Sequence, residues 1–281
     1  MSAEDRTSGC AEVAFTNRDG ATRLAHLFER NPLRVLFPKV DDLPTAVLMT
    51  TSGGLVAGDR IDVAVMVGEG AAAHLTASAA EKIYRSTGPV TQIAQRLVVD
   101  AGAWLEFLPP ETILFDNAKL RRVTRVELAD GGGLLGGGII VFGRIAMGER
   151  FSTGLLNERW EVHHNGRLVW GDALHLANSP WGDVAATMAD PACFAGAEAC
   201  ATLILAPPRD PPGAYIDAAR AVQQQSLPLG LRGGVSAVNG LLVARWLGDA
   251  LAVRRGYAEL ACHLRAEAMG LPARLPRLWH V

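Results

Sequence analysis

The sequence VAVMVGEGAAAHLTA at residues 63–77 decides the fold class, because its pattern occurs three times along the chain. It reads as a strand of alternating apolar residues, an acidic or glycine turn, and a second apolar strand. The other copies are QRLVVDAGAWLEFLP at 95–109 and TRVELADGGGLLGGG at 124–138, and the turns are marked by Gly70, Gly102 and Gly132. A recurring unit of about 30 residues predicts stacked strands that wind into a layered, solenoid-like body. Ordinary hairpins in a β-sandwich are the alternative.

Turn signals and helical spacing organise the rest of the chain. Asn165-Gly166 and Asn239-Gly240 each predict a two-residue hairpin turn. A buried strand is expected at 199–207, and helices are expected at 213–226 and 249–270. The prediction is a mainly β fold, a solenoid-like, layered winding of many short strands with two helices late in the chain. It forms a single domain, 1–281, with a β-rich body at 10–206 and a helix-containing C-terminal part at 207–281.

Composition limits the classes of function. The 281 residues are 49% hydrophobic with a net charge of −2, so a core can form and no basic footprint for nucleic acid is expected. The longest apolar run, 131–143, is too short to span a bilayer, and the N-terminus lacks an apolar signal core. The four cysteines form no C-x-x-C pair. We therefore expect a soluble, cytoplasmic protein that binds neither nucleic acid nor membrane.

The segment TSGGLVAGDRI at 51–61 is similar in spacing to a phosphate-binding loop. Such a loop needs Lys and Ser/Thr after its last glycine, whereas this chain has Asp59 and Arg60. A carboxylate at the lysine position repels phosphate, and the alternation that follows predicts a strand where a phosphate-binding loop opens a helix. The segment is therefore interpreted as a glycine turn in which Asp59 bonds its own backbone.

Acidic residues in apolar surroundings are the most informative polar feature. Glu111, Glu149 and Asp172 interrupt strand-like sequence, and Glu106 lies within WLEF. A carboxylate in such a place must be paired, hydrogen-bonded or in contact with water inside the body. Ion pairs with Arg85, Arg144 or Arg150 are one interpretation, and an internal polar passage able to handle a cation is the other. No nucleophile motif and no metal-ligand spacing appears, which favours a binding or scaffold role over catalysis.

An ordered set of motifs closely resembles the UreD (UreH) family of urease accessory proteins. The set is ATRLAHLFERNPLRVLFP (21–38), GGLVAGDRI (53–61), LTASAAEKIYRS (75–86), GAWLEFLPPETILFDNAKL (102–120), FGRIAMGERFSTGLL (142–156), GRLVWGD (166–172), NGLLVARWLGD (239–249) and LPRLW (275–279). These motifs cover most of the chain. Ser52 and Ala57 depart from the proline and glycine that members of the family often carry there.

This resemblance implies a β-rich winding of strands with two helices and a non-catalytic chaperone that helps insert nickel into urease. The implied partners are UreF, the GTPase UreG recruited through UreF, and the urease apoenzyme. No tightly bound cofactor is expected, and nickel is expected to pass transiently through the interior over weak oxygen sites. The candidate nickel contacts are Glu111, Glu149, Asp59 and Asp172, although Asp59 is expected mainly to lock its turn.

The contact with UreF is expected on helix 249–270 and the region 207–230, where Tyr257, Leu260 and Leu264 form one apolar stripe. The alternative is that this stripe packs on the sheet. Two other functions stay open at this point. One is a purely structural adaptor that handles no metal. The other is a β-rich enzyme that uses Glu111 or Asp59 as a general acid or base.

Overall fold

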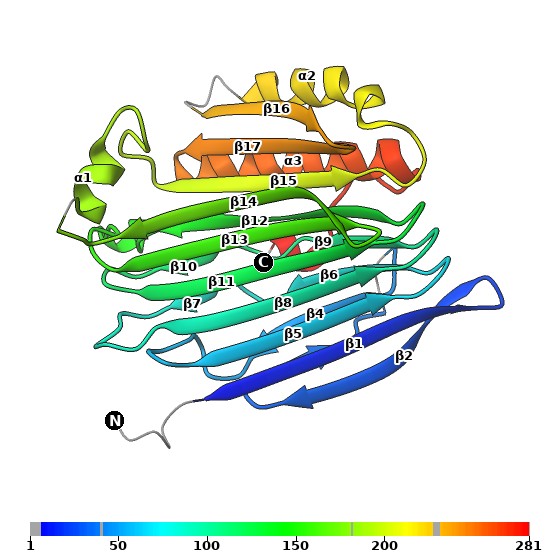
Figure 1. Cartoon of the computed structure of the whole chain (residues 1–281), viewed down its shortest axis with the longest axis horizontal. Helices are drawn as coiled ribbons and strands as arrows, with labels where there is room; N and C mark the ends of the chain where they lie inside the picture. Colours follow the sequence, from blue (N-terminus) through cyan, green and yellow to red (C-terminus); the bar gives the residue numbers. More distant parts are fainter. Residues whose placement is uncertain (1–6, 40–41, 181, 227–230, 281) are drawn as a thin grey trace.

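The computed structural model describes residues 7–39, 42–180, 182–226 and 231–280, in which two large β-sheets face each other (Figure 1). The seven-stranded sheet has the order β14-β13-β11-β8-β5-β1-β2. Its strands are β1 (Ser8–Arg18), β2 (Ala21–Arg30), β5 (Arg60–Val67), β8 (Thr91–Val99), β11 (Lys119–Leu128), β13 (Leu155–His164) and β14 (Arg167–Ala177).

The ten-stranded sheet has the order β16-β17-β15-β12-β9-β6-β4-β3, with β7 and β10 paired beside β12. Its strands are β3 (Leu33–Leu36), β4 (Thr45–Thr50), β6 (Ala72–Ala77), β7 (Glu81–Ile83), β9 (Trp104–Phe107), β10 (Thr112–Leu114), β12 (Gly133–Phe142), β15 (Ala199–Ala206), β16 (Arg232–Val238) and β17 (Leu241–Gly248).

The repeated segments form the coils of a solenoid. In each copy the first strand joins the seven-stranded sheet and the strand after the turn joins the ten-stranded sheet. Strands of successive coils are parallel and in register, so that Val63 lies beside Gln95 and Gln95 beside Thr124. The solenoid-like prediction is confirmed. The hairpin alternative is wrong for these segments, because the two strands of each copy pair with other coils and not with each other.

The turns between the sheets stack in the same way. Gly70, Gly102 and Gly131 adopt left-handed backbone with φ of 63°, 63° and 70°. The third turn glycine is therefore Gly131, whereas the sequence pattern had indicated Gly132. Gly132 serves another purpose, since a Cβ there would lie 2.9 Å from the carbonyl oxygen of Val99. Its lack of a side chain lets the third turn approach the coil beneath it.

Three α-helices and several 3₁₀ turns complete the described chain. The helices are α1 (Val184–Ala189), α2 (Ile216–Ser226) and α3 (Ala250–Met269), and the 3₁₀ turns include η2 (Ile145–Met147), η3 (Pro212–Ala214) and η5 (Arg277–His280). α3 begins as expected, because the Asp249 carboxylate accepts a hydrogen bond from the Ala252 amide at 2.9 Å, and it ends at Gly270 with φ 65°. α1 was not predicted, since six residues are too few to show a helical period.

The ten-stranded sheet separates two apolar cores. One lies between the sheets, and the other lies between the outer face of the ten-stranded sheet and helices α2 and α3. The glycines of β12 allow this second contact, since a Cβ on Gly137 would lie 2.1 Å from the Thr202 carbonyl oxygen and 2.9 Å from the Tyr257 hydroxyl. Figure 1 shows α2 and α3 at one end of the stack, and β1 and β2 at the other.

Candidate functional site

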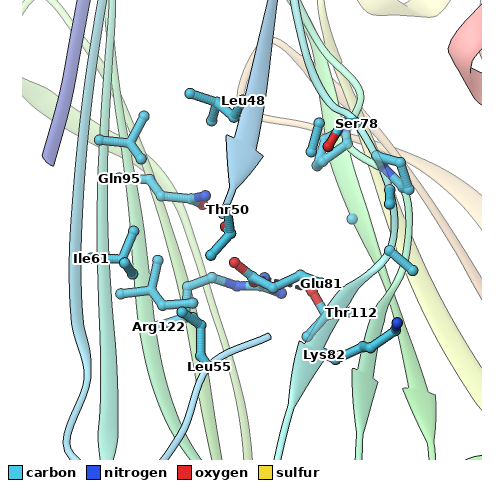
Figure 2. Close-up of a pocket in the computed structure, with 18 of the residues that line it drawn as sticks. Leu48, Thr50, Leu55, Ile61, Ser78, Glu81, Lys82, Gln95, Thr112 and Arg122 are labelled. Atoms are coloured by element: carbon cyan, nitrogen blue, oxygen red, sulfur yellow. Dashed lines mark hydrogen bonds and ion pairs between the residues drawn. The ribbon is translucent and has the colours of Figure 1, made fainter. Parts of the chain in front are cut away.

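A cavity of about 220 Å³, lined by apolar and by charged side chains, lies between the two sheets (Figure 2). Its walls come from strands of several coils and from the glycine turn that precedes β5. They include Leu48, Thr50, Leu55, Ile61, Ser78, Glu81, Lys82, Gln95, Thr112 and Arg122. Most neighbouring positions between the sheets are apolar, so the charged side chains at this wall need a specific explanation.

Arg122 is the centre of the charged group. Its Nε donates to Glu158 at 3.0 and 2.7 Å, and its Nη1 donates to the Thr112 hydroxyl at 2.8 Å and to Glu81 at 3.4 Å. Figure 2 shows the Arg122 side chain extending across the cavity toward Glu81 and Thr112. The indole nitrogen of Trp160 donates a further hydrogen bond to Glu158 at 3.1 Å. One guanidinium thus holds two carboxylates that come from opposite sheets.

The strand pattern explains why these side chains point inward. Arg122 lies between the buried residues Leu120 and Thr124 on β11, and Glu158 lies between Leu156 and Trp160 on β13. Arg122 and Glu158 are register partners in the parallel β11–β13 pair. The same alternation that builds the apolar core therefore places an ion pair inside it.

Burial is the largest influence on the pKa of both carboxylates, Glu81 and Glu158. It raises the pKa of Glu81 and of Glu158 above the ordinary glutamate value, and the Arg122 charge offsets only part of that rise. The two carboxylates also repel each other, which raises the pKa of Glu81 further. The cluster is thus short of positive charge, because two acidic groups share one cation.

The polar groups continue from Glu158 toward the surface. Burial raises the pKa of the Cys200 thiol to about 12, and the charges of Glu158 and Asp172 contribute to this rise. Asp172 also raises the pKa of Glu158. Asp172 is half-buried and forms an ion pair with Arg245, in which Asp172 Oδ2 lies 2.8 Å from Arg245 Nη2. We call Glu81, Thr112, Arg122, Glu158, Cys200 and Asp172 the interior polar row.

Of the four carboxylates proposed from the sequence, the structure places only Asp172 in this row. Glu149 lies in the loop after β12, where Arg144 Nε donates to it at 3.1 Å, as the ion-pair interpretation expected. Glu111 pairs with Arg254 of α3. Arg254 also donates to the Trp279 carbonyl oxygen at 2.6 Å, so Glu111 helps to hold the C-terminal segment on the sheet. In the parts of the chain that the structure describes, no group of three or more His, Cys, Asp or Glu side chains is placed to hold a metal ion.

Asp59 is buried, and its side chain stabilises the turn that contains it. Its Oδ2 accepts from the Val56 amide at 2.9 Å and its Oδ1 accepts from the Thr7 amide at 3.3 Å. The strand predicted after it is β5. The turn also supplies Gly53, Gly54 and Leu55 to the wall of the cavity. The segment is therefore a structural turn at the edge of the candidate site.

The Asp59→Ala variant should unfold more easily than the native chain. Loss of the carboxylate removes the acceptor of the part-buried Val56 and Thr7 amides, which costs about 1–3 kcal/mol in the free energy of unfolding. Asp62→Ala is the control, because Asp62 is half-buried and lies on β5, the strand that follows the turn; we expect a change within about 0.5 kcal/mol. Urea unfolding measures both. Equal stabilities of the two variants, with urease activation lost only in Asp59→Ala, would instead assign Asp59 to the passage.

The apolar stripe of α3 is buried and does not form part of the protein surface. Tyr257, Leu260 and Leu264 have no exposed area and pack against the ten-stranded sheet, as the alternative interpretation of this stripe proposed. Their placement leaves no area for a partner, so a contact with UreF through α3 needs other residues. Of the region 207–230 that was proposed with them, residues 227–230 lie outside the described chain.

A second buried ion cluster fixes α3 to the sheet. Glu106 of β9 accepts from Arg265 at 3.0 and 3.2 Å and is 3.1 Å from Nδ1 of His74. Burial alone would raise the pKa of Glu106, but the hydrogen bonds and charges of His74 and Arg265 lower it below the ordinary value. Arg265 also donates to the carbonyl oxygens of Pro272 and Arg274 at 2.7 and 2.6 Å. The hydrogen bonds of Arg265 thus hold α3 and the segment that follows it on the ten-stranded sheet.

Comparison with known proteins agrees with the motif order. The family model described as UreD urease accessory protein matches residues 7–280. A "Urease accessory protein UreD" of Magnetococcus marinus is 42% identical over 278 residues, which cover 97% of this chain and 94% of the relative. "Urease accessory protein UreD 1" of Methylobacterium radiotolerans is 40% identical over 92% of this chain and 86% of the relative.

Among the residues that the structure describes, no helix is both long and apolar enough to cross a membrane. The family match spans residues 7–280, which include both sheets and the C-terminal helix. The chain belongs to the UreD family of urease accessory proteins.

Proposed function

We propose that the chain is a non-catalytic chaperone of urease maturation that works in the cytoplasm. In this proposal it binds UreF, which recruits the GTPase UreG, contacts the urease apoenzyme, and passes nickel to the urease active site. The observation that carries the nickel step is the interior polar row, which crosses the space between two otherwise apolar sheets. No resident cofactor is required, because nickel is the cargo.

The chemistry of the row suits transfer better than storage. Glu81, Glu158 and Asp172 supply carboxylate oxygens, and Thr112 supplies a hydroxyl. The Cys200 thiol stays protonated at neutral pH because its pKa is raised to about 12, so it is a neutral neighbour of the two carboxylates. Sites with one or two oxygen ligands hold a divalent cation weakly, and weak successive sites let an ion move on.

Partner contacts are proposed on the exposed apolar side chains. Leu251 is 77% exposed on the first turn of α3, so it can replace the buried stripe as part of the UreF contact. At the other end of the stack, β2 exposes Leu24, Leu27 and Phe28 at 42–45%. Large exposed apolar residues that gather at one end of a molecule are typical of interaction surfaces. In this proposal β2 contributes a surface for one partner, and Leu251 contributes an exposed apolar side chain to the contact with the other.

Deletion of the gene tests the accessory role itself. We expect urease protein to be present in the deletion strain but inactive and nickel-free, because urease would lack its maturation partner. Urease activity in extracts and nickel in purified urease measure this, and the intact gene supplied in trans is the control. Fully active urease in the deletion strain would contradict the role.

A structural adaptor without metal handling is the second candidate. The observation that favours it is that each carboxylate of the row has an arginine partner, as in a purely structural ion pair. The two candidates differ in one outcome. An adaptor tolerates neutralisation of a row carboxylate as long as the partner complex stays intact, whereas a relay does not.

A further inference from the structure

We propose that the guanidinium of Arg122 is a resident cation in a divalent-cation site formed by Glu81, Glu158 and the Thr112 hydroxyl, and that nickel passes when this side chain swings aside. The inference rests on the nickel passage proposed above and adds a gate to it. The Arg122 nitrogens already occupy the position between the carboxylates that a cation would take, at 2.7 Å from Glu158 and 3.4 Å from Glu81.

The charge of the cluster favours exchange with a divalent ion. Two carboxylates share a single guanidinium, so the group carries one net negative charge when both are ionised. Lys82 does not correct this deficit, because its side chain is exposed and points away from the group (Figure 2). A divalent cation in place of Arg122 neutralises the charges of both carboxylates. This neutralisation is favourable because an uncompensated charge in a buried site has a high free-energy cost.

The cavity gives the arginine a place to go. Arg122 is one of the residues that line the space of about 220 Å³. Its contact with Glu81 is the longest of its ion pairs at 3.4 Å, and Glu81 keeps 28% of its side chain exposed. The guanidinium can therefore leave the Glu81 side first while Glu158 still holds Nε, and the entering ion meets the partly exposed Glu81 before the more deeply buried Glu158.

The unequal exposure of the two carboxylates gives the site a direction. Glu158 keeps only 8% of its side chain exposed and is also held by Trp160. On β14, the strand paired with β13, Asp172 is the register partner of Trp160 and keeps 30% of its side chain exposed. An ion that displaces Arg122 thus moves from Glu81 to Glu158 and then toward Asp172, and the guanidinium returns behind it.

The binding of Ni²⁺ to the full chain, purified with its partner complex and studied by equilibrium dialysis, tests the gate. Arg122→Gln removes the competing cation and leaves both carboxylates, so we expect the chain to bind Ni²⁺ at least about tenfold more tightly. The double variant Arg122→Gln/Glu158→Gln should lose that gain. Arg150→Gln is the control, because Arg150 forms an exposed pair with Glu198, and its nickel affinity should match the native chain.

A second variant covers the case in which Arg122→Gln does not fold. Arg122→Lys keeps the charge but not the fork that bonds both carboxylates, so its nickel affinity should lie between the native and Gln values. A folded Arg122→Gln or Arg122→Lys chain with native nickel affinity would overturn the gate. If Glu158→Gln still blocks urease activation in that case, only the role of Arg122 fails. If Glu158→Gln leaves activation unchanged, the passage itself fails.

Discussion

Replacement of Arg265 by Met is expected to cost about 3–5 kcal/mol in the free energy of unfolding, the largest stability effect of any single change considered. Glu106 is fully buried, and its polar partners are His74 at 3.1 Å and Arg265 at 3.0 and 3.2 Å. Removal of the guanidinium leaves that buried carboxylate without its permanently charged partner. It also leaves the carbonyl oxygens of Pro272 and Arg274 without their donor, so the C-terminal segment loosens together with α3.

Two further variants separate this effect from loss of a surface charge. Arg255→Met changes an exposed arginine of the same helix that pairs with Glu259, and exposed pairs contribute less than about 1 kcal/mol. Arg265→Met/Glu106→Leu removes both charges and should recover part of the loss, because the buried carboxylate is gone, although His74 then loses its contact with Glu106. Urea unfolding of the full chain measures all three. An Arg265→Met chain as stable as Arg255→Met would show that the cluster does not hold α3.

Neutralisation of Glu158 is expected to have the largest effect on function. Glu158→Gln removes one of the two carboxylates on Arg122 but leaves Glu81 to compensate the guanidinium, so the fold should be retained. The amide oxygen can still accept the Arg122 hydrogen bonds. The row, however, loses its most buried charged ligand, and we expect urease activation to fall by about 10- to 100-fold, the range typical when the surroundings of a metal site are altered.

The control for this variant lies on the same strand. Glu161→Gln changes a carboxylate that pairs with Arg159 on the outer face of β13, and urease activity in extracts should match that of the native protein. Thermal unfolding of both variants confirms that the fold is intact. Equal urease activity in the Glu158→Gln and Glu161→Gln strains would favour the adaptor over the relay.

The sequence predicts the coils well because alternation directly reports which face of a strand is buried. Ile61, Val63, Val65 and Val67 alternate in the sequence, and all four lie in the core between the sheets. The Asn-Gly turns likewise predict their hairpins, since Asn165 and Gly166 adopt the left-handed backbone that such turns need, with φ of 50° and 74°. These features are local, so no knowledge of the partner strand is necessary.

The candidate site could be predicted only in part because it depends on register between coils. Arg122 stands among other arginines on β11, and only the alternation counted from Leu120 and Thr124 places it on the inner face. Its meeting with Glu158 follows from the parallel pairing of β11 with β13, which the lengths of the intervening coils set. The pairing of Glu106 with Arg265 spans 159 residues and has no local signal.

Apolar stripes mislead in a different way. Tyr257, Leu260 and Leu264 have the spacing of a helix face that binds something, and the sequence cannot say whether the partner is another protein or the chain's own sheet. The glycines of β12 indicate that the stripe packs on the sheet. A strand that carries Gly136, Gly137 and Gly138 in its centre allows a close neighbour, and the Tyr257 hydroxyl fills that position.

The nickel content of urease tests the central claim most directly. Urease is purified from strains that carry the native chain, Glu158→Gln or Glu161→Gln, and nickel is counted per active site while copurification of UreF, UreG and urease with the chain is checked in parallel. The account predicts that urease from the Glu158→Gln strain is largely empty although the complex forms, and that urease from the Glu161→Gln strain is filled. Fully loaded urease in the Glu158→Gln strain would contradict a nickel path through the interior polar row.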